Sequence, residues 1–513
     1  MLVTIFHHYA NRFANQFLDD AFNNTEPDYF KSMQKVFANK AIDICACDGI
    51  DKKFFDEANN QYKNILSVVN DIGENPSLKD QEYNILIEPS FFCEALGIQG
   101  RMDCLIDIVS ANKKFLIELK SGKWDEFRNA PKEDHLMQML LYKEILYFNT
   151  DTPQSDVLGH LLYSKYPHLY EQRSFLDIVL QALTIRNSIF CMEQGLAEGK
   201  AREWIPRLTP EKLKTKECSP KLWIPYCLPS LQNAIELLHS MDKLTEEYFY
   251  AFLQFIEREQ MEGKLSISRP DSNRSLSSLW NTDVATKREN GDIFLDLRIV
   301  QMRCDDGVVD ICVEPNAMED DMSMPNFRIG DSVILYKRNS EKDTAISQQV
   351  VRCNIQSYEG DRVWLHMNYP QRNKEVFDTE SLWAIEHDSI EATFRSQYQS
   401  IYSLVTVEKS RRELLLCQRV PEYDTDIQLV SDSMPEYSTS SLNPSVKEIV
   451  LKAKQAKDMF MLMGPPGTGK TSVTLKAMVE EGLASGHNIL LLSYTNRAVD
   501  EICQMLSTIS TKP

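Results

Sequence analysis

The chain contains, near its C-terminal end, the stretch Gly464-Pro465-Pro466-Gly467-Thr468-Gly469-Lys470-Thr471. This stretch matches the pattern G-x-x-x-x-G-K-[ST] at every constrained position. Its glycines let successive backbone N–H groups turn toward phosphate oxygens at the start of a helix, where the helix dipole also attracts anions. We therefore expect all eight residues to hold nucleotide phosphates, with Lys470 reaching the β- and γ-phosphates and Thr471 binding Mg²⁺.

The sequence on both sides of this loop has the context that a phosphate-binding loop requires. The apolar run from Met459 to Met463 precedes it and predicts a buried strand. Ser472 to Ala484 has helical spacing, and a second apolar run from Ile489 to Ser493 predicts another buried strand. The pattern therefore predicts an α/β arrangement around the loop.

A second motif narrows the class of nucleotide-binding protein. Residues Ser493–Ile502 read SYTNRAVDEI, and together with GPPGTGKT they resemble motifs I and Ia of superfamily 1 helicases, in particular the Upf-like and replicative nuclease-helicase types. The resemblance implies a RecA-like P-loop domain and ATP as its ligand. It also implies that Thr495 and Asn496 contact the backbone of a bound single strand.

Two departures from the helicase pattern matter. Leu442–Val446 resembles the opening motif of the family, but Val446 stands where an adenine-reading glutamine is expected, which leaves base selectivity open. The chain also stops at Pro513, before an acidic strand, an arginine finger or a second lobe. We therefore expect a truncated helicase that binds ATP through Lys470 without turning it over.

A different chemistry is encoded far upstream. Two β-rich runs, Met102–Val109 and Lys114–Lys120, are separated by a short polar turn and predict a hairpin. Because side chains alternate along a strand, Glu118 and Lys120 share one face, and Asp103 on the partner strand can reach the same place. Carboxylates suit Mg²⁺ or Mn²⁺, and a neighbouring lysine can orient or deprotonate an attacking water.

The order of these residues resembles the PD-(D/E)xK nuclease superfamily. The stretch Gly100–Asp103 and the later Glu118-Leu119-Lys120 look like the RecB-type branch, and Gln138 and Tyr142 supply its QxxxY pair on one face of a predicted helix. The resemblance implies a restriction-endonuclease-like α/β fold. It also implies that Asp103 and Glu118 bind the metal, that Lys120 assists the water, and that Gln138 and Tyr142 position the substrate.

Two further family features are unclear or missing. The superfamily often supplies another Glu or His from an upstream helix, and here the candidates are Asn15, Asp19 and, more weakly, Glu88. Many nuclease-helicases also bind an iron–sulfur cluster through closely spaced cysteines after QxxxY. Here the cysteines are widely spaced, so we expect no such cluster: Cys191, Cys218 and Cys227.

The region between the two motif sets predicts a small β-barrel. Several short β-runs with turn residues between them are typical of one, and Phe327–Val333 resembles the barrel of Upf-like and nuclease-helicase proteins. From Pro153 to Gly263 the pattern favours helices. We expect a multidomain α/β protein with a nuclease domain at 1–265, a barrel at 280–392, a helical stalk and linker at 393–440, and a partial P-loop domain at 441–513.

The net charge and the cysteine content bear on nucleic-acid binding and on the cellular compartment. The net charge of −19 argues against a generally basic nucleic-acid coat but leaves room for a local groove. Twelve irregularly spaced cysteines are typical of free thiols in a reducing compartment. No leader or membrane-spanning run is visible, so we expect a cytoplasmic protein without a membrane partner.

These patterns together predict a metal-dependent DNA nuclease joined to an ATP-binding helicase module, acting on single strands or flaps. Two alternatives remain open at this point. One is a non-catalytic module that binds nucleic acid and ATP and whose nuclease half is degenerate. The other is an Upf-like RNA helicase with an accessory domain, in which RNA rather than DNA is the partner.

Overall fold

The computed structural model describes residues 2–23, 26–45, 50–74, 78, 81–173, 175–215, 218–266, 275–304, 307–316, 326–388, 392–434 and 441–509. The chain divides into two compact units. The first comprises Met1–Ala201 with Leu253–Arg395, and the second comprises Arg202–Phe252 with Ser396–Pro513.

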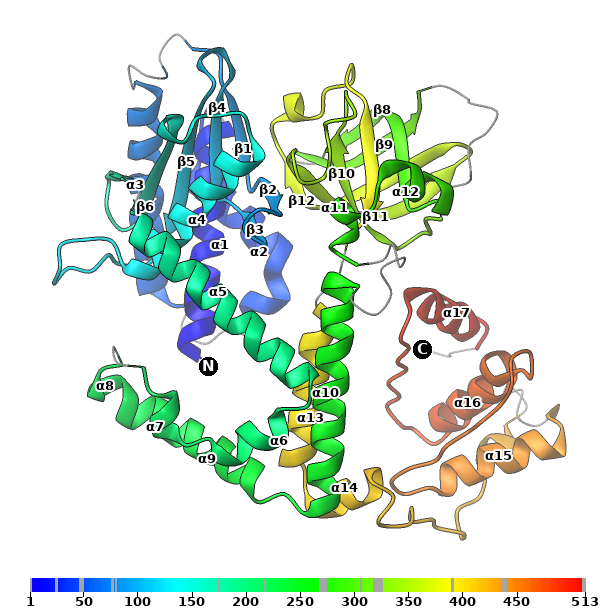
Figure 1. Ribbon diagram of the computed structural model, residues 1–513. Helices are drawn as coiled ribbons and strands as arrows, with labels where there is room; N and C mark the ends of the chain where they lie inside the picture. The colour runs from blue at the N-terminus through cyan, green and yellow to red at the C-terminus, as the bar shows by residue number, and fades with distance from the viewer. Residues whose placement is uncertain are drawn as a thin grey trace. The chain divides into compact units, whose positions relative to one another are not determined.

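The N-terminal part of the first unit is built on a mixed five-stranded sheet with the order β1-β4-β5-β6-β7 (Figure 1). Strands β5 and β6 are parallel, and the other neighbours are antiparallel. The strands are β1 (Asn84–Ile87), β4 (Cys104–Ile108), β5 (Lys113–Lys120), β6 (Val157–Tyr163) and β7 (Leu169–Gln172). The predicted hairpin is confirmed as β4 and β5, which are joined by a short 3-10 turn (Val109–Ala111).

Helices cover both faces of this sheet. Phe115, Ile117 and Leu119 of β5 pack with the first three helices, whereas Leu116 packs with the next two, as strand alternation requires. Asp51 caps the third helix by accepting a hydrogen bond from the backbone N–H of Phe54. The helices are α1 (Leu2–Asn23), α2 (Tyr29–Cys45), α3 (Lys52–Gly73), α4 (Glu133–Asn149) and α5 (Leu176–Ala197).

The expectation of helices throughout residues 153–263 is wrong in its first part, where β6 and β7 lie. Strand β6 reads VLGHLLY, an almost continuous apolar run beside β5. A strand that is buried on both faces loses the alternation of polar and apolar residues, so periodicity alone does not distinguish it from a buried helix. The sequence pattern therefore did not reveal β6 or its parallel pairing with β5.

The remainder of the first unit contains a closed six-stranded barrel. Its strand order is β10-β13-β8-β9-β12-β11, and pairing of β10 with β11 closes the ring. Strand β13 was not predicted, whereas the other five strands follow the β-runs of the sequence, namely Ile293–Met302, Val308–Val313, Ser332–Tyr336, Val350–Ser357 and Arg362–Met367. The strands are β8 (Ile293–Cys304), β9 (Val308–Pro315), β10 (Ser332–Lys337), β11 (Val350–Glu359), β12 (Arg362–Gln371) and β13 (Trp383–His387).

The barrel is joined to the N-terminal region by specific contacts. The hairpin β2 (Ser90–Cys93) and β3 (Ile98–Arg101) adds to the barrel sheet through Val350 and Ser90. Beyond these strands, the side-chain amide of Gln371 donates to the backbone carbonyl of Ile87 at 2.7 Å. Helices α10 (Lys243–Leu265), α11 (Ser278–Asn281) and α12 (Val284–Asn290) precede the barrel.

The second unit is helical in its described residues. Its helices are α6 (Ala201–Trp204), α7 (Pro210–Leu213), α8 (Pro220–Leu222), α9 (Leu228–His239), α13 (Ala392–Thr406), α14 (Lys409–Leu415), α15 (Pro444–Gln455), α16 (Lys476–Ala484) and α17 (Asn496–Leu506), together with the first part of α10, up to Phe252. Ala201 and Ala392–Arg395 are counted in the first unit. A π-helical segment, Lys470–Leu475, leads into α16. The helical spacing predicted for Ser472–Ala484 is therefore confirmed.

The two buried strands predicted around the phosphate-binding loop are not present in the described residues. Met459–Met463 and Ile489–Ser493 lie outside every strand, and Met463, Leu490 and Leu492 are 95%, 80% and 80% exposed. The physical reason is the absence of sheet partners within described residues 441–509, because a single extended segment has no neighbour for its backbone hydrogen bonds.

In the part of the chain that the structure describes, no helix combines the length and apolar character that a membrane crossing requires.

Candidate active site

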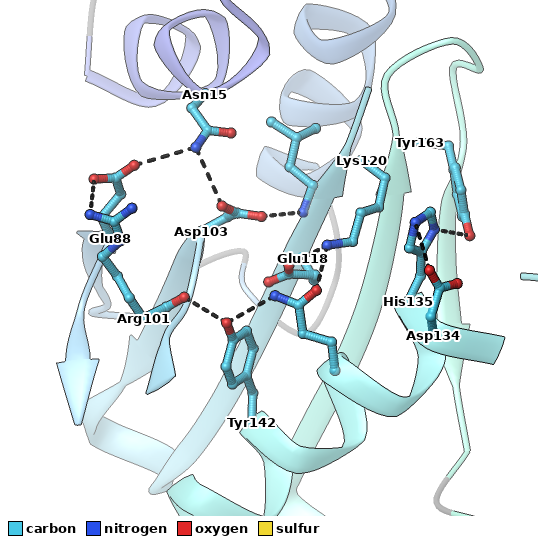
Figure 2. A network of polar contacts seen from close by, with 12 residues as sticks. Asn15, Glu88, Arg101, Asp103, Glu118, Lys120, Asp134, His135, Tyr142 and Tyr163 are labelled. Carbon is cyan, nitrogen blue, oxygen red and sulfur yellow. Dashed lines mark hydrogen bonds and ion pairs between the residues drawn. The ribbon is translucent and has the colours of Figure 1, made fainter. Parts of the chain in front are cut away.

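The centre of the candidate site is strand β5, where Glu118 and Lys120 project from the face that α4 covers (Figure 2). The Lys120 ammonium donates to the Glu118 Oε1 atom at 2.7 Å and to the Gln138 Oε1 atom at 2.7 Å. Glu118 is only 2% exposed. The alternation of β5 therefore places a carboxylate and an ammonium in direct contact within the protein.

Asp103 reaches the same place from the connection between β3 and β4. Its Oδ2 atom accepts a hydrogen bond from the backbone N–H of Leu119 at 2.7 Å, which fixes the carboxylate beside β5. Burial raises the pKa of Asp103, although this hydrogen bond and the charge of Lys120 act in the opposite direction. The two carboxyl groups that the sequence paired are thus held next to each other.

The environment of Glu118 strongly disfavours its charge. Burial, and then the negative charge of Asp103, raise its pKa to about 8, while the ammonium of Lys120 partly opposes them. Its second oxygen, Oε2, is buried and has no hydrogen-bond partner among the described residues. A buried carboxylate oxygen without a partner is costly unless another group completes its environment.

A chain of hydrogen bonds continues from Lys120 into α4. The Gln138 Nε2 atom lies 3.0 Å from the Tyr142 hydroxyl, which donates to the backbone carbonyl of Arg101 at 2.8 Å. Burial raises the pKa of Tyr142, so the hydroxyl remains protonated and able to donate. A Cβ at Gly100 would lie 2.7 Å from the Tyr142 ring, so this close packing requires glycine.

Residues distant in the sequence complete the centre. The Asn15 amide on α1 donates to the Asp103 Oδ1 atom at 3.4 Å and to the Glu88 Oε1 atom at 3.3 Å. Glu88 has a left-handed backbone (φ 53°) and lies 3.7 Å from the Arg101 guanidinium. Of the upstream candidates, Asn15 and Glu88 therefore lie at Asp103, whereas Asp19 pairs with Arg372 at 3.2 Å.

One further side chain near the centre was not singled out in the sequence. The His135 Nδ1 atom lies 2.9 Å from the Tyr163 hydroxyl, and Figure 2 shows the pair on the Lys120 side of the network. Burial lowers the pKa of His135 to about 4, and Lys120 contributes in the same direction. Its position three residues before Gln138 on α4 was the only sequence feature that pointed to it.

The donor set fits a divalent metal ion. Asp103 and Glu118 offer hard carboxylate oxygens. The Oε2 atom of Glu118 is a buried acceptor without a partner among the described residues, and a bound cation would satisfy it. The described residues contain no cluster of three or more His, Cys, Asp or Glu side chains suited to a metal. The residues that would hold an ion are therefore these two carboxylates, with backbone oxygen or water completing its shell.

The phosphate-binding loop is built from glycines and backbone carbonyl contacts, unlike the nuclease-like centre formed by Asp103, Glu118 and Lys120. Gly467 and Gly469 both have φ of 78°, the left-handed conformation that glycine adopts without strain. The Lys470 ammonium is hydrogen-bonded to the carbonyl oxygens of Gly464 and Pro465, the latter at 2.8 Å. Thr471 lies in the first turn of the π-helical segment. The loop thus has glycine-dependent geometry, and its lysine contacts the loop backbone.

The predicted strand-contacting pair is only partly described. The Thr495 hydroxyl accepts a hydrogen bond from the backbone N–H of Ala498 at 3.2 Å and so caps α17. The side chain of Asn496 lies outside the described part of the structure. Thr495 therefore stabilises the N-terminus of α17, whereas the predicted role of Asn496 stays a prediction.

Comparison with known proteins finds one matching family at the C-terminal end and relatives over most of the chain. The AAA domain family matches residues 441–512. The chain is 32% identical over 192 residues to the Arabidopsis thaliana DNA replication ATP-dependent helicase/nuclease JHS1, covering 36% of this chain and 14% of the relative. It is 23% identical to the Mus musculus DNA2 protein of the same description, over 82% of this chain and 40% of the relative. The Homo sapiens DNA2 protein is 21% identical over 82% of this chain and 41% of the relative.

The chain spans about two fifths of the length of the DNA2 relatives that it matches over most of its own length. The similarity covers more of the chain than either motif set does alone. The chain is therefore a distant homologue of the DNA2-like helicase/nucleases over 82% of its length, with an AAA domain segment at its C-terminal end.

Proposed function

We propose that this chain is a divalent-metal-dependent DNA nuclease, coupled to an ATP-binding helicase segment, that hydrolyses phosphodiester bonds in single strands or flaps. The relatives are described as DNA replication helicase/nucleases, which supports DNA as the substrate. The observation that carries the proposal is the pair of carboxylates at β5. The buried Glu118 has an unsatisfied oxygen beside Asp103, and Lys120 is in direct contact with it.

Each side chain then has a distinct task. Asp103 and Glu118 would hold Mg²⁺ or Mn²⁺, which supplies charge stabilisation and activates water when bound. Lys120, held by Glu118 and Gln138, would orient the attacking water and stabilise the charge that develops on the phosphate. Gln138 and Tyr142 keep the Arg101 backbone and the Lys120 ammonium in a fixed relation, which positions the bound strand.

The phosphate-binding loop would bind ATP. ATP use is supported by the AAA domain match over residues 441–512 and by the helicase descriptions of the relatives. On binding, Lys470 would exchange the carbonyl oxygens of Gly464 and Pro465 for phosphate oxygens, and Thr471 would approach Mg²⁺. We expect this segment to bind nucleotide.

The test is cleavage of end-labelled linear and of circular single-stranded DNA in Mn²⁺ or Mg²⁺. We expect the unaltered chain to cut, and we expect Glu118→Gln and Lys120→Ala to lose cleavage about a hundredfold or more. Cutting of the circle would identify endonuclease activity. RNA of equal length serves as the competing substrate.

The matched controls lie on β5 and on its neighbour β4. Lys114 pairs with Asp107 at 2.8 Å near the other end of β5, so Lys114→Ala and Asp107→Asn remove a comparable ion pair away from the centre. We expect both controls to cleave normally. The assignment of Glu118 and Lys120 to catalysis would be contradicted if their variants cleaved as well as the unaltered chain. It would also be contradicted if all four variants lost cleavage.

A second function, a non-catalytic module that binds DNA and ATP, is favoured by one observation. Helix α1 presents the amide of Asn15 to Asp103, where a carboxylate or imidazole would be a stronger metal ligand. This alternative predicts DNA binding without cleavage in Mn²⁺. Calorimetric titration of Mn²⁺ into the unaltered chain and Glu118→Gln distinguishes the two, because only the nuclease requires a metal site that depends on Glu118.

A further inference from the structure

Arg101 lies at the exposed edge of the candidate active site. It ends β3, two residues before Asp103, and the Tyr142 hydroxyl holds its backbone carbonyl. Its side chain is 41% exposed. Among the described residues the guanidinium pairs with Glu88 at 3.7 Å, which is longer than a hydrogen bond, so its N–H donors remain accessible.

The barrel supplies an aromatic partner at the same place. The Arg101 guanidinium lies over the ring of Tyr369 on β12, 4.1 Å from the ring centroid. Tyr369 is 44% exposed, so both members of the pair are accessible to solvent. An arginine stacked on an aromatic ring is kept in one orientation while the edge of its guanidinium is left free to donate.

The residues that follow Tyr369 in the chain make partly buried contacts with β1 and α1. The amide of Gln371 donates to the Ile87 carbonyl at 2.7 Å, and the amide of Asn373 donates to the Ile85 carbonyl at 3.0 Å. Arg372, whose side chain is 8% exposed, pairs with Asp19 and with Asp20 of α1, the latter at 2.5 Å. The end of β12 is therefore anchored to α1 and to the backbone of β1, close to Tyr369.

This pair has the chemistry that binds single-stranded DNA. A guanidinium edge binds a backbone phosphate, and an aromatic ring or the plane of a stacked guanidinium supports an unpaired base. Arg101 lies beside the negative charge of Glu88 and is a cation that a strand approaching Asp103 from this side would meet. Two regions of the chain thus contribute to one surface.

We propose that Arg101 and Tyr369 form a composite binding site for the single DNA strand that enters the nuclease centre, with Arg101 on a phosphate and Tyr369 against a base. The inference rests on the proposed function only in naming the strand as the nuclease substrate. It gives the β-barrel a direct part in substrate binding, and it places that part at Tyr369.

The first test measures binding without cleavage. A short fluorescein-labelled oligothymidylate is titrated with the full chain in EDTA at several salt concentrations, and its anisotropy is followed. We expect Arg101→Ala to weaken binding and to reduce the slope of log affinity against log salt by about one, the signature of one lost phosphate contact. We expect Tyr369→Ala to weaken binding about tenfold, whereas Tyr369→Phe retains most of the affinity.

Matched controls lie at the opposite end of the same hairpin. Arg362→Ala and Tyr358→Ala remove an exposed arginine and an exposed tyrosine from the β11–β12 turn, where Tyr358 pairs with Val363. Both controls are expected to bind as the unaltered chain does. A photo-crosslinking residue placed at 369 should label with the oligonucleotide, and the same residue at 358 should not.

The two hypotheses fail in different ways. If the chain does not cleave DNA in Mn²⁺ but Arg101→Ala and Tyr369→Ala weaken DNA binding as expected, the nuclease proposal is overturned and the strand-binding site is supported. Unchanged affinity in both variants, or equal labelling at 369 and 358, would overturn the strand site whatever the cleavage result. Weakened binding of RNA but not of DNA would overturn the assignment to single-stranded DNA.

Discussion

Two buried glutamates, one in each compact unit, differ in almost everything except their burial. Glu118 on β5 and Glu481 on α16 are each 2% exposed. Glu118 accepts from Lys120 and keeps one oxygen without a partner. Glu481 accepts from five donors, namely the Lys454 ammonium, the backbone N–H groups of Val430 and Ser431, and the hydroxyls of Ser431 and Ser485.

The pKa values follow from this difference in donors. Burial raises the pKa of Glu118 to about 8. Burial acts in the same direction on Glu481, but the hydrogen bonds from Lys454 and Ser431 outweigh it and lower the pKa to about 2. A saturated carboxylate is a structural anchor, whereas an unsaturated one is prepared for a ligand. Glu481 is therefore held as an anchor within the second unit, whereas Glu118 keeps an oxygen that the proposed metal ion would satisfy.

The largest expected effects are on DNA cleavage and on ATP binding, which should be lost separately in the two units. We expect Glu118→Gln to reduce DNA cleavage about a thousandfold with nucleotide affinity unchanged. We expect Lys470→Ala to weaken ATP binding about a hundredfold with cleavage unchanged. Cleavage assays and a fluorescent ATP analogue measure the two quantities. Loss of both activities in either variant would mean that the two sites are not independent.

The next effect concerns local stability. Glu481→Gln leaves the Lys454 ammonium buried without its counter-charge, so we expect the opening free energy of α16 to fall by about 3 kcal/mol. Hydrogen exchange of peptides from residues 476–484 measures this. Glu118→Gln, which replaces a group that is already largely neutral at pH 7, should leave the exchange of β5 within about 1 kcal/mol of the unaltered chain. Similar losses at both positions would remove the contrast.

The two glutamates also predict opposite pH dependences in the metal-free chain. The folded pKa of Glu118 is raised, so between about 4.3 and about 8 the folded state holds a proton that the unfolded state has lost, and stability falls as pH rises. The folded pKa of Glu481 is lowered, so its contribution is present above about 4.3 and is lost as pH falls toward 2.

Melting curves in EDTA from pH 3 to pH 9 measure this dependence. The Glu118→Gln variant is expected to flatten the decline between pH 6 and pH 8, whereas Glu481→Gln is expected to flatten the acidic limb. Added Mn²⁺ should weaken the decline above pH 6, because the metal stabilises the charged form of Glu118. An unchanged profile in Glu118→Gln would show that another group titrates there.

The smallest effect tests whether Thr495 is an anchor or a DNA contact. Thr495→Ala removes the cap of α17 and should lower the local opening free energy by about 1 kcal/mol, whereas Thr495→Ser retains the hydroxyl and the cap. If capping is the main role, the affinity for single-stranded DNA stays within twofold in both variants. A large loss of DNA affinity in Thr495→Ala would assign the residue to the strand as well.

Local patterns were the most predictable part of the molecule. Alternation along β5 sufficed to place Glu118 beside Lys120, and helical spacing sufficed to align Gln138 with Tyr142. Asn15 could only be named as one of several candidates, because its contact with Asp103 joins α1 to a strand end far along the chain. No local pattern encodes such a meeting of distant elements.

The errors have equally specific causes. Strand β6 is apolar along its length, so it lacks the alternation by which strands are recognised. The buried strands expected near Gly464 depended on a sheet that the described residues of this region do not form. Tyr369 was not predicted at all, because its contact with Arg101 depends on how the barrel strand β12 is anchored to the nuclease-like region.

That anchor also bears on how the protein folds. If the barrel region were removed, the carbonyl oxygens of Ile85 and Ile87 and the carboxylates of Asp19 and Asp20 would lose partners that β12 and the two residues after it provide. Because the loss of these hydrogen bonds and ion pairs costs stability, the nuclease-like region and the barrel should melt in a single cooperative transition. An exchange of this barrel for one from an unrelated protein would therefore have to reproduce those four contacts before the nuclease-like region could keep its native structure.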